Sequence, residues 1–206
     1  MALRLAAILS SVLLGACSVV GIRSGTEEPA FTVVAREGEV EIRRYAARIA
    51  AETAVEGSEE EARQEGFRRL AGYIFGGNAR RDRIAMTAPV AQSPGERIAM
   101  TAPVAQSGDG SRIRFFMPAR FTMETLPVPN DPRVALVTVP EETVAVLRFS
   151  GLPGASSVAD RRAALLAALE AGGWRPMGEV QAWFYDPPWT VPALRRNEVV
   201  VAVAPR

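Results

Sequence analysis

The stretch RIAMTAPVAQSPGERIAMTAPVAQS runs from Arg83 to Ser107 and contains one segment twice, because Arg83–Ser93 recurs letter for letter as Arg97–Ser107. Two copies are too few for a repeat array, which needs several units to bury a continuous core. The alternating positions of the first copy are apolar: Ile84, Met86, Ala88 and Val90. This period of two is typical of a β-strand with one buried face.

The residues between the two copies are typical of a turn, since Pro94 fixes φ and Gly95 permits a positive φ. The pattern therefore predicts a β-hairpin whose arms are near duplicates, with these two residues at its exposed turn. The expected buried positions of the two arms are Ile84, Met86, Val90, Ile98, Met100 and Val104. Methionine fills irregular gaps in cores, which favours packing for Met86 and Met100, with ligand contact as the alternative.

The composition is that of a globular protein. The 206 residues are 48% hydrophobic and 23% charged, which suits one domain or two closely packed halves with a real core. Lys and Arg number 24 and Asp and Glu 23, for a net charge of +1. A nucleic-acid-binding domain usually has a strongly basic face, so we expect no nucleic-acid partner.

Histidine is absent from the chain. This excludes Ser-His-Asp and Cys-His nucleophile systems, HExxH zinc sites and imidazole ligation of haem iron. No combination of nucleophile, base and oxyanion donors is visible, so we expect no enzyme and no metal site. A hydrolase that uses only a carboxylate and water is the alternative.

The N-terminus has the layout of a secretory signal. Arg4 precedes an apolar run, Leu5–Leu14, that is shorter than the roughly 20 residues a membrane-spanning helix needs. Leu14-Gly15-Ala16-Cys17 resembles the lipobox of bacterial lipoproteins, whose cysteine receives a lipid and becomes the new N-terminus. The alternative is an ordinary cleaved signal with an incidental cysteine.

Cys17 is the single cysteine, so an intramolecular disulfide is excluded and lipidation suits it better than redox chemistry. We expect residues 1–16 to be a signal peptide, 17–30 a lipidated tether and 31–206 the folded domain. Ser18 follows the cysteine, and by resemblance to Gram-negative sorting this implies an anchor in the outer membrane, facing the periplasm.

The remaining chain shows the order strands, helix, strands twice. The expected strands are Phe31–Val34, Glu39–Arg43, Arg48–Val55, Arg112–Met117, Val134–Val139, Thr143–Phe149, Gln181–Tyr185 and Val199–Val203. Ser58 and Glu61 form the capping box of a first helix, and Ser156 or Ser157 caps a second. The pattern predicts an α+β fold in which two similar halves share one sheet.

Several stretches together resemble the SOUL haem-binding protein family. They are IAMTAPV after a helix that ends in YIFGGN, FFMPARFTMETLPVPNDPRV, VAVLRFSG, WFYDPPWT and RRNEV. The most specific are Tyr185–Pro188 and Arg196–Glu198, and the resemblance covers roughly Phe31 to Val203. It implies a distorted antiparallel β-barrel made of two βαββ-like halves with two flanking helices.

The resemblance also implies non-covalent binding of haem or a related tetrapyrrole in an apolar groove between the first helix and the loop after Asp186. The implied helix positions are Phe67, Leu70, Ala71 and Ile74, and the loop positions are Trp189 and Thr190. Haem propionates need cations nearby, which Arg63, Arg68 or Arg195 could supply. The same helical stripe equally suits simple packing against the sheet.

Two functions remain open from the sequence. The first is a lipid-anchored envelope protein that binds haem or a porphyrin without histidine ligation. The second is a small-molecule effector or amphiphile-binding module with the same barrel and no haem role, since the barrel also resembles bacterial effector-binding domains, in which an acidic residue meets cationic ligands.

Overall fold

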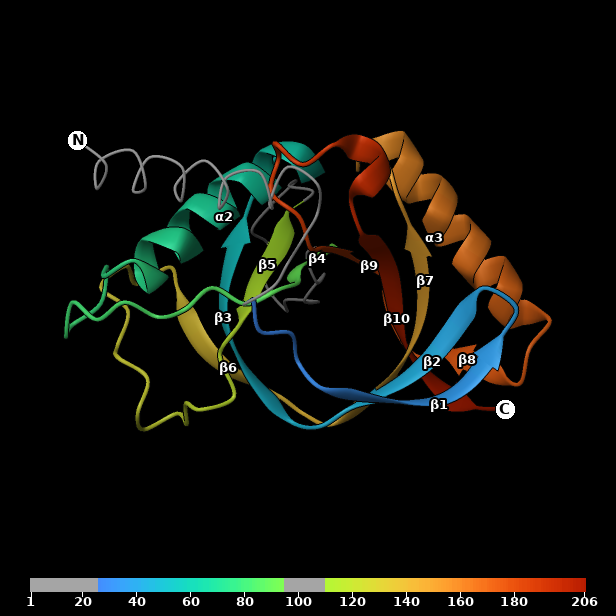
Figure 1. Ribbon diagram of the computed structural model, residues 1–206, viewed down its shortest axis with the longest axis horizontal. Helices are drawn as coiled ribbons and strands as arrows, with labels where there is room; N and C mark the ends of the chain where they lie inside the picture. The colour runs from blue at the N-terminus through green and yellow to red at the C-terminus, as the bar shows by residue number, and fades with distance from the viewer. Residues whose placement is uncertain (1–25, 95–109) are drawn as a thin grey trace, which may run out of the picture.

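The computed structural model describes residues 26–94 and 110–206, which form one curled antiparallel sheet with two helices on its outer face (Figure 1). The strands are β1 (Phe31–Glu37), β2 (Val40–Tyr45), β3 (Arg48–Val55), β4 (Val90–Pro94), β5 (Ser111–Phe116), β6 (Ala135–Val139), β7 (Glu142–Phe149), β8 (Trp174–Pro176), β9 (Gln181–Phe184) and β10 (Asn197–Pro205). The helices are α2 (Glu59–Ile74) and α3 (Ala155–Glu170), and a 3-10 turn, η1 (Pro192–Leu194), precedes β10. Within the described part of the chain, no helix combines the length and apolarity needed to cross a membrane.

The strand order of the sheet is β1-β2-β7-β10-β9-β4-β5-β3-β6, with β8 paired to β10 at one side. The predicted α+β fold with two βαββ-like halves is confirmed, because β3-α2-β4-β5 and β7-α3-β9-β10 follow the same path. The strand before each unit pairs with the other unit, since β2 lies beside β7 and β6 beside β3. The two halves are therefore interlocked in one sheet that curls without closing.

Helix α2 begins where the sequence predicts. The Ser58 side chain accepts from the Glu61 backbone N–H, and the Glu61 carboxylate accepts from the Ser58 N–H, so the capping box is present. Helix α3 differs from the prediction, since its N-cap is Gly154 and no side chain caps it. Ser157 instead donates to the Leu152 and Gly154 carbonyls, because it lies inside the first turn rather than ahead of it.

The duplicated stretch does not form the predicted hairpin. The strand of the first copy begins only at Val90, and residues 84–89 form a loop that contains an isolated bridge between Thr87 and Glu27 and a cis Ala88–Pro89 bond. One edge of β4 is paired with β5 and the other with β9, so a second copy cannot lie beside it. Ile84 and Val90 are buried as predicted, and Met86 is half-buried. Residues 95–109, which hold the whole second copy and Gly95 of the predicted turn, lie outside the described residues.

The loop before β4 differs from a strand because its backbone groups are satisfied elsewhere. Pro89 has no N–H to donate to a ladder. The Ala88 N–H donates to the Glu27 carbonyl, and the Thr87 hydroxyl donates to the Phe116 carbonyl. An alternating sequence thus indicates an extended backbone here, but not the strand partner that the hairpin interpretation assigned to it.

The core has three apolar clusters. One lies between α2 and the sheet, and a second lies between α3 and the sheet. The third lies on the inner, concave face and is built around Tyr45, Phe116 and Trp183. The two helices therefore bury the outer face, whereas the inner face is available for a different kind of packing.

Candidate functional site

One flank of α2 carries three of the residues that the family resemblance implies. Arg63, Phe67 and Ala71 follow at i, i+4 and i+8, so they lie along one side of the helix. The Arg63 guanidinium lies 4.8 Å from the Phe184 ring centre and donates to the Pro153 carbonyl at 3.4 Å. This flank therefore faces β9 and the connection from β7 to α3.

Phe67 is the large apolar side chain exposed on this flank. It is 40% exposed, although its ring also lies 5.3 Å from that of Phe115 on β5. Leu70 and Ile74 are fully buried between α2 and the sheet, in the core. A ligand on the surface can thus reach Phe67 and Ala71, while the other two side chains support the helix from below.

Arg68 lies on a different side of α2. It pairs with Glu65 at 2.5 Å, and both residues border a shallow hollow of about 390 Å³ between the helix and the segment that contains Asn130, Asp131 and Arg133. The structure therefore separates Arg68 from Arg63. The lining of this hollow is largely charged, which does not suit the apolar face of a ring system.

The loop from Asp186 to Arg196 is held by its own hydrogen bonds. The Asp186 carboxylate accepts from the Arg196 N–H at 2.7 Å, and Arg195 donates to the Pro188 carbonyl and, at 2.8 Å, to that of Thr190. Thr190 is buried, so it supports the loop from inside. Trp189, by contrast, is 64% exposed at its tip.

The same loop is tied to the start of α3. The Gly151 N–H donates to the Pro192 carbonyl at 2.9 Å, and the Asn197 side chain donates to the Gly151 carbonyl at 3.1 Å. Large apolar side chains are exposed around this junction: Leu152, Trp189, Val191 and Leu194. We call this group, together with Arg63, Phe67 and Ala71, the helix–loop surface.

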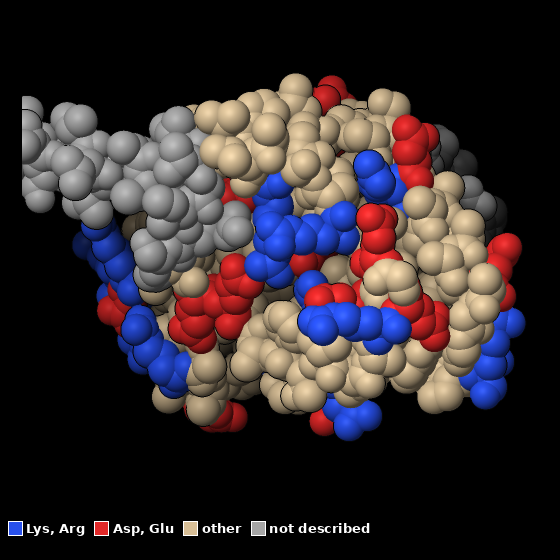
Figure 2. Space-filling model, turned by 45° about the vertical axis from the view of Figure 1, so that its right-hand side comes forward, with Lys and Arg blue, Asp and Glu red and all other residues tan. Residues whose placement is uncertain are grey.

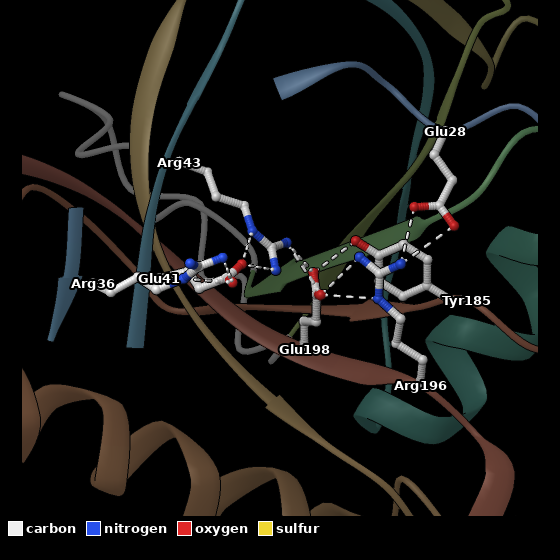
Figure 3. Close-up of polar contacts among 7 residues, drawn as sticks. All are labelled: Glu28, Arg36, Glu41, Arg43, Tyr185, Arg196 and Glu198. Carbon is white, nitrogen blue, oxygen red and sulfur yellow. Dashed lines mark hydrogen bonds and ion pairs between the residues drawn. The ribbon is translucent and has the colours of Figure 1, made fainter. Parts of the chain in front are cut away.

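A second cluster, which the sequence interpretation missed, lies on the inner face and is drawn in Figure 3. Its centre is Glu198, which is 0% exposed. Glu198 accepts from Arg43 at 3.0 and 3.1 Å, from Arg196 at 2.9 and 3.0 Å and from the Tyr185 hydroxyl at 2.6 Å. Its carboxylate is thus fully engaged by three partners on three different strands or strand ends.

The cluster extends outward in both directions from Glu198. Arg43 also donates to Glu41, which accepts from Arg36, and Arg196 also donates to Glu28 at 3.0 Å (Figure 3). Figure 2 shows the same interleaving of basic and acidic side chains on the face that it displays. The arrangement pairs cations with anions across β1, β2, β10 and the residues before β1.

Burial and charge shift the titration of this cluster. Burial, and then the negative charge of Glu198, raise the pKa of Tyr185 well above its usual value, so the hydroxyl stays protonated. Burial alone would lower the pKa of Arg43, but Glu198 and Glu41 outweigh it and the pKa is raised. These groups therefore keep fixed charges, which suits structural support rather than proton transfer.

The signal for this cluster was present in the sequence. Tyr185-Asp186-Pro187-Pro188 and Arg196-Asn197-Glu198 are the two motifs that carry the family resemblance most specifically. The structure brings Tyr185 and Glu198 into contact. Arg43 could not be found in this way, because it lies on β2, far from both motifs in the sequence. Among residues 26–94 and 110–206, no group of three or more His, Cys, Asp or Glu side chains could hold a metal ion.

The fold is shared with solved structures. The C-terminal domain of EcmrR matches with a TM-score of 0.60 at 10% identity, over 81% of this chain and 98% of that one. An uncharacterized conserved protein from Listeria innocua matches with a TM-score of 0.60 at 14% identity, over 82% and 94% of the two chains. A hydrolase from Listeria innocua matches with a TM-score of 0.55 at 14% identity, over 83% and 94%. At such identities the likeness shows the fold alone.

No curated protein matches this sequence. The profile of the SOUL heme-binding protein family, however, matches residues 26–202. This range includes both helices and all ten strands, apart from the last three residues of β10. The match covers most of the chain, and it agrees with the Tyr185 and Glu198 motifs that meet on the inner face. The chain therefore belongs to the SOUL heme-binding protein family.

Proposed function

We propose that this protein is a cell-envelope carrier or buffer that binds haem or a related tetrapyrrole, non-covalently, at the helix–loop surface. The family supports haem or porphyrin as a ligand in general terms. The observation that supports this location is the exposure of Phe67. This large apolar side chain is 40% exposed beside Arg63, on the flank of α2 that faces β9.

The side chains of this surface fit a porphyrin held by its faces and its carboxylates. Phe67 and Trp189 offer aromatic surfaces against which a flat ring can pack. Arg63 is the cation on this flank, and a guanidinium pairs well with a propionate. Apolar burial, worth roughly 25 cal/mol per Å² before the costs of association, supplies most of the affinity.

The described residues offer neither an imidazole nor an exposed phenol as an axial ligand for iron. It contains no histidine, and its three tyrosines, Tyr45, Tyr73 and Tyr185, are all buried. The Tyr73 hydroxyl donates to the Pro127 carbonyl and that of Tyr185 to Glu198, so neither is free to ligate iron. Affinity should therefore depend on the porphyrin ring and its propionates rather than on iron.

The test is a titration of hemin and of iron-free protoporphyrin into the full chain in mild detergent, followed by absorbance and tryptophan fluorescence. We expect saturable binding of both, with dissociation constants within about tenfold of each other. Hemin should show no bis-imidazole low-spin spectrum. Unsaturable titrations, or a strong dependence on iron, would contradict the proposal.

Matched variants locate the site. Phe67→Asp should weaken binding of both porphyrins by more than about tenfold, because it places a charge in the apolar contact. Phe75→Asp, at an exposed phenylalanine at the C-cap of α2, is the control and should bind normally. Arg63→Ala should weaken binding a few-fold, whereas Arg68→Ala, on the other side of the helix, should not.

We further propose that Cys17 anchors the protein by a lipid to the outer membrane, facing the periplasm. The lipobox-like Leu14–Cys17 after a short apolar run supports this. Mass spectrometry of the mature N-terminus should find acylated Cys17, and Cys17→Ala should move the protein to the soluble fraction. A mature chain that begins elsewhere, with unmodified Cys17, would remove the anchor from the proposal.

We propose a binding role rather than an enzymatic one. Glu198 is the most buried carboxylate of the inner face, but two arginines and a tyrosine already occupy it. It is therefore a poor general base, and it is equally unsuited to receive a cationic ligand. This supports tetrapyrrole binding over the alternative of a module for cationic effectors.

A further inference from the structure

Two largely exposed segments meet at one end of the fold, and neither contains a charged residue. The first, residues 151–159, follows β7 and includes the first turn of α3, and the second, residues 187–194, belongs to the loop between β9 and β10. The Gly151 N–H joins them by its hydrogen bond to the Pro192 carbonyl. In Figure 1 this junction lies at the top of the molecule, where η1 is next to the start of α3. We call the two segments together the uncharged apex.

The apex differs in composition from the rest of the surface. Lys, Arg, Asp and Glu make up 23% of the chain, yet the apex exposes apolar side chains instead. Leu152 is 62% exposed, Trp189 64% and Leu194 49%. A group of large apolar side chains on a protein surface marks a contact with another protein or with a membrane. The apex is therefore a contact surface whose partner has to be identified by its chemistry.

The backbone of the loop has few groups that need water. Pro187, Pro188 and Pro192 have no N–H to donate. The loop carbonyls that already accept hydrogen bonds from within the protein are those of Pro187, Pro188, Thr190, Val191 and Pro192. Polar backbone groups that lose water without another partner are costly in lipid, so a loop with satisfied carbonyls can enter a lipid surface at a lower cost.

The described chain begins beside this loop. Glu28 accepts from Arg196 at 3.0 Å, at the point where the loop joins β10. Cys17, the proposed site of the lipid, precedes Glu28 by only 11 residues. Even when fully extended, such a connection spans at most about 40 Å. A lipid on Cys17 would therefore keep the bilayer within reach of the end of the molecule that carries the apex.

We propose that the uncharged apex inserts into the headgroup region of the bilayer, with Leu152, Trp189 and Leu194 against the upper ends of the acyl chains. Tryptophan favours this region because its ring is apolar while its N–H is polar. The short connection to the lipid favours a bilayer over a protein as the partner. The inference rests on the lipid anchor of the proposed function and does not depend on porphyrin binding.

The test is the quenching of tryptophan fluorescence in phosphatidylcholine vesicles with brominated acyl chains, in the absence of porphyrin. The acylated chain is incorporated from detergent, and vesicles without bromine are the reference. Trp183 is buried and Trp174 lies on β8, so the quenching should come from Trp189 and disappear in Trp189→Phe. Bromine near the headgroup should quench more than bromine near the methyl end. Emission that bromine leaves unchanged, or quenching that persists in Trp189→Phe, would overturn the proposal.

A charge in the apex should disrupt the contact. Leu194→Asp should reduce the quenching severalfold, because a carboxylate is costly among acyl chains. Val128→Asp is the matched control, since Val128 is 68% exposed on the connection between the two halves, and it should be quenched like the unmodified protein. Equal quenching in the two variants would overturn the proposal, because the apex would then make no apolar contact with the lipid.

A missing anchor can be distinguished from a missing contact. If Cys17 carries no lipid, its thiol, the single one of the chain, can be coupled to a maleimide lipid in the same vesicles. Quenching of Trp189 in the coupled protein would support the contact even though the native anchor had failed. Absence of quenching in the coupled protein would overturn it, whatever the hemin titrations show.

Discussion

The outer and inner faces of the curled sheet are buried by different chemistry. On the outer face, apolar side chains of α2 and α3 such as Leu70 and Leu165 pack against apolar side chains of the sheet such as Ile113. On the inner face, aromatic rings lie beside buried ion pairs, with Glu198 fully enclosed between Arg43 and Arg196. The stability of the outer face depends on how well apolar side chains fill its volume, whereas each charge on the inner face is stabilised only by its charged partners.

Substitutions on the two faces should therefore have different costs in stability. A side chain on the outer face can be shortened at a cost that depends on the cavity left behind. Removing one charge from the inner face leaves its partners buried and uncompensated, which costs more than the pair itself contributes.

Glu198→Gln should destabilise the protein by about 3–5 kcal/mol, because it leaves Arg43 and Arg196 without their shared buried anion. The measurement is the free energy of unfolding from denaturant titration followed by circular dichroism. Glu41→Gln is the matched control, since Glu41 is partly exposed, and should cost about 1 kcal/mol or less. Similar losses in the two variants would show that full burial of the Glu198 charge carries no special cost on the inner face.

Gly66→Ala should destabilise the outer face by about 1–3 kcal/mol, although alanine favours helix. A Cβ at Gly66 would lie 2.4 Å from Ile113 Cγ1, so α2 would have to move away from β5. Gly72→Ala on the same helix meets no atom within 4 Å and should stabilise by up to about 1 kcal/mol. Thermal melts of the two variants should shift in opposite directions, and shifts of the same sign would contradict this packing.

Alkaline pH should weaken both faces through their buried tyrosines. Burial raises the pKa of Tyr73, under α2, to about 12, and burial and then Glu198 raise the pKa of Tyr185 well above 10. The stability is complete below pH 10, the unfolded pKa of tyrosine, because both states are then protonated. Above about pH 10 the unfolded state alone loses the protons, so the free energy of unfolding falls by about 1.4 kcal/mol per pH unit for each tyrosine.

Denaturant titrations between about pH 9 and about pH 12 should reveal the two contributions separately. Tyr185→Phe should reduce the slope throughout the range above about pH 10, whereas Tyr73→Phe should reduce it only until about pH 12. An unchanged slope in Tyr185→Phe would show that the inner hydroxyl titrates as it does in the unfolded chain.

Removal of residues 94–107 should change the free energy of unfolding by less than about 1 kcal/mol. The variant keeps Val90, which faces outward, and Ala91, which faces inward, and joins β4 to β5 through Gly108–Gly110. Loop length enters stability only logarithmically, so a shorter connection has a small effect. A loss of cooperative unfolding in a thermal melt would show that both faces depend on the second copy.

Much of the fold could be predicted from local patterns. The capping box at Ser58 and Glu61 predicted the start of α2, and the apolar stripe that contains Leu70 and Ile74 predicted its buried side. Phe67 belongs to the same stripe but lies at its edge, where the sheet covers it only in part. The start of α3 was misplaced because Ser157 resembles a cap in sequence and acts inside the first turn instead.

The sequence by itself determined the two similar halves, the helix that follows Ser58, the absence of imidazole chemistry and the family motifs around Tyr185 and Glu198. The tertiary structure alone established that β4 lies between β5 and β9, that Arg43 meets Glu198 and that Arg48 lies against Tyr45, Phe116 and Glu142. The physical reason is the separation along the chain over which each interaction acts. Periodicity, caps and turns act between near neighbours, whereas strand partners and buried ion pairs join residues far apart in the chain, so they form only when the whole sheet assembles.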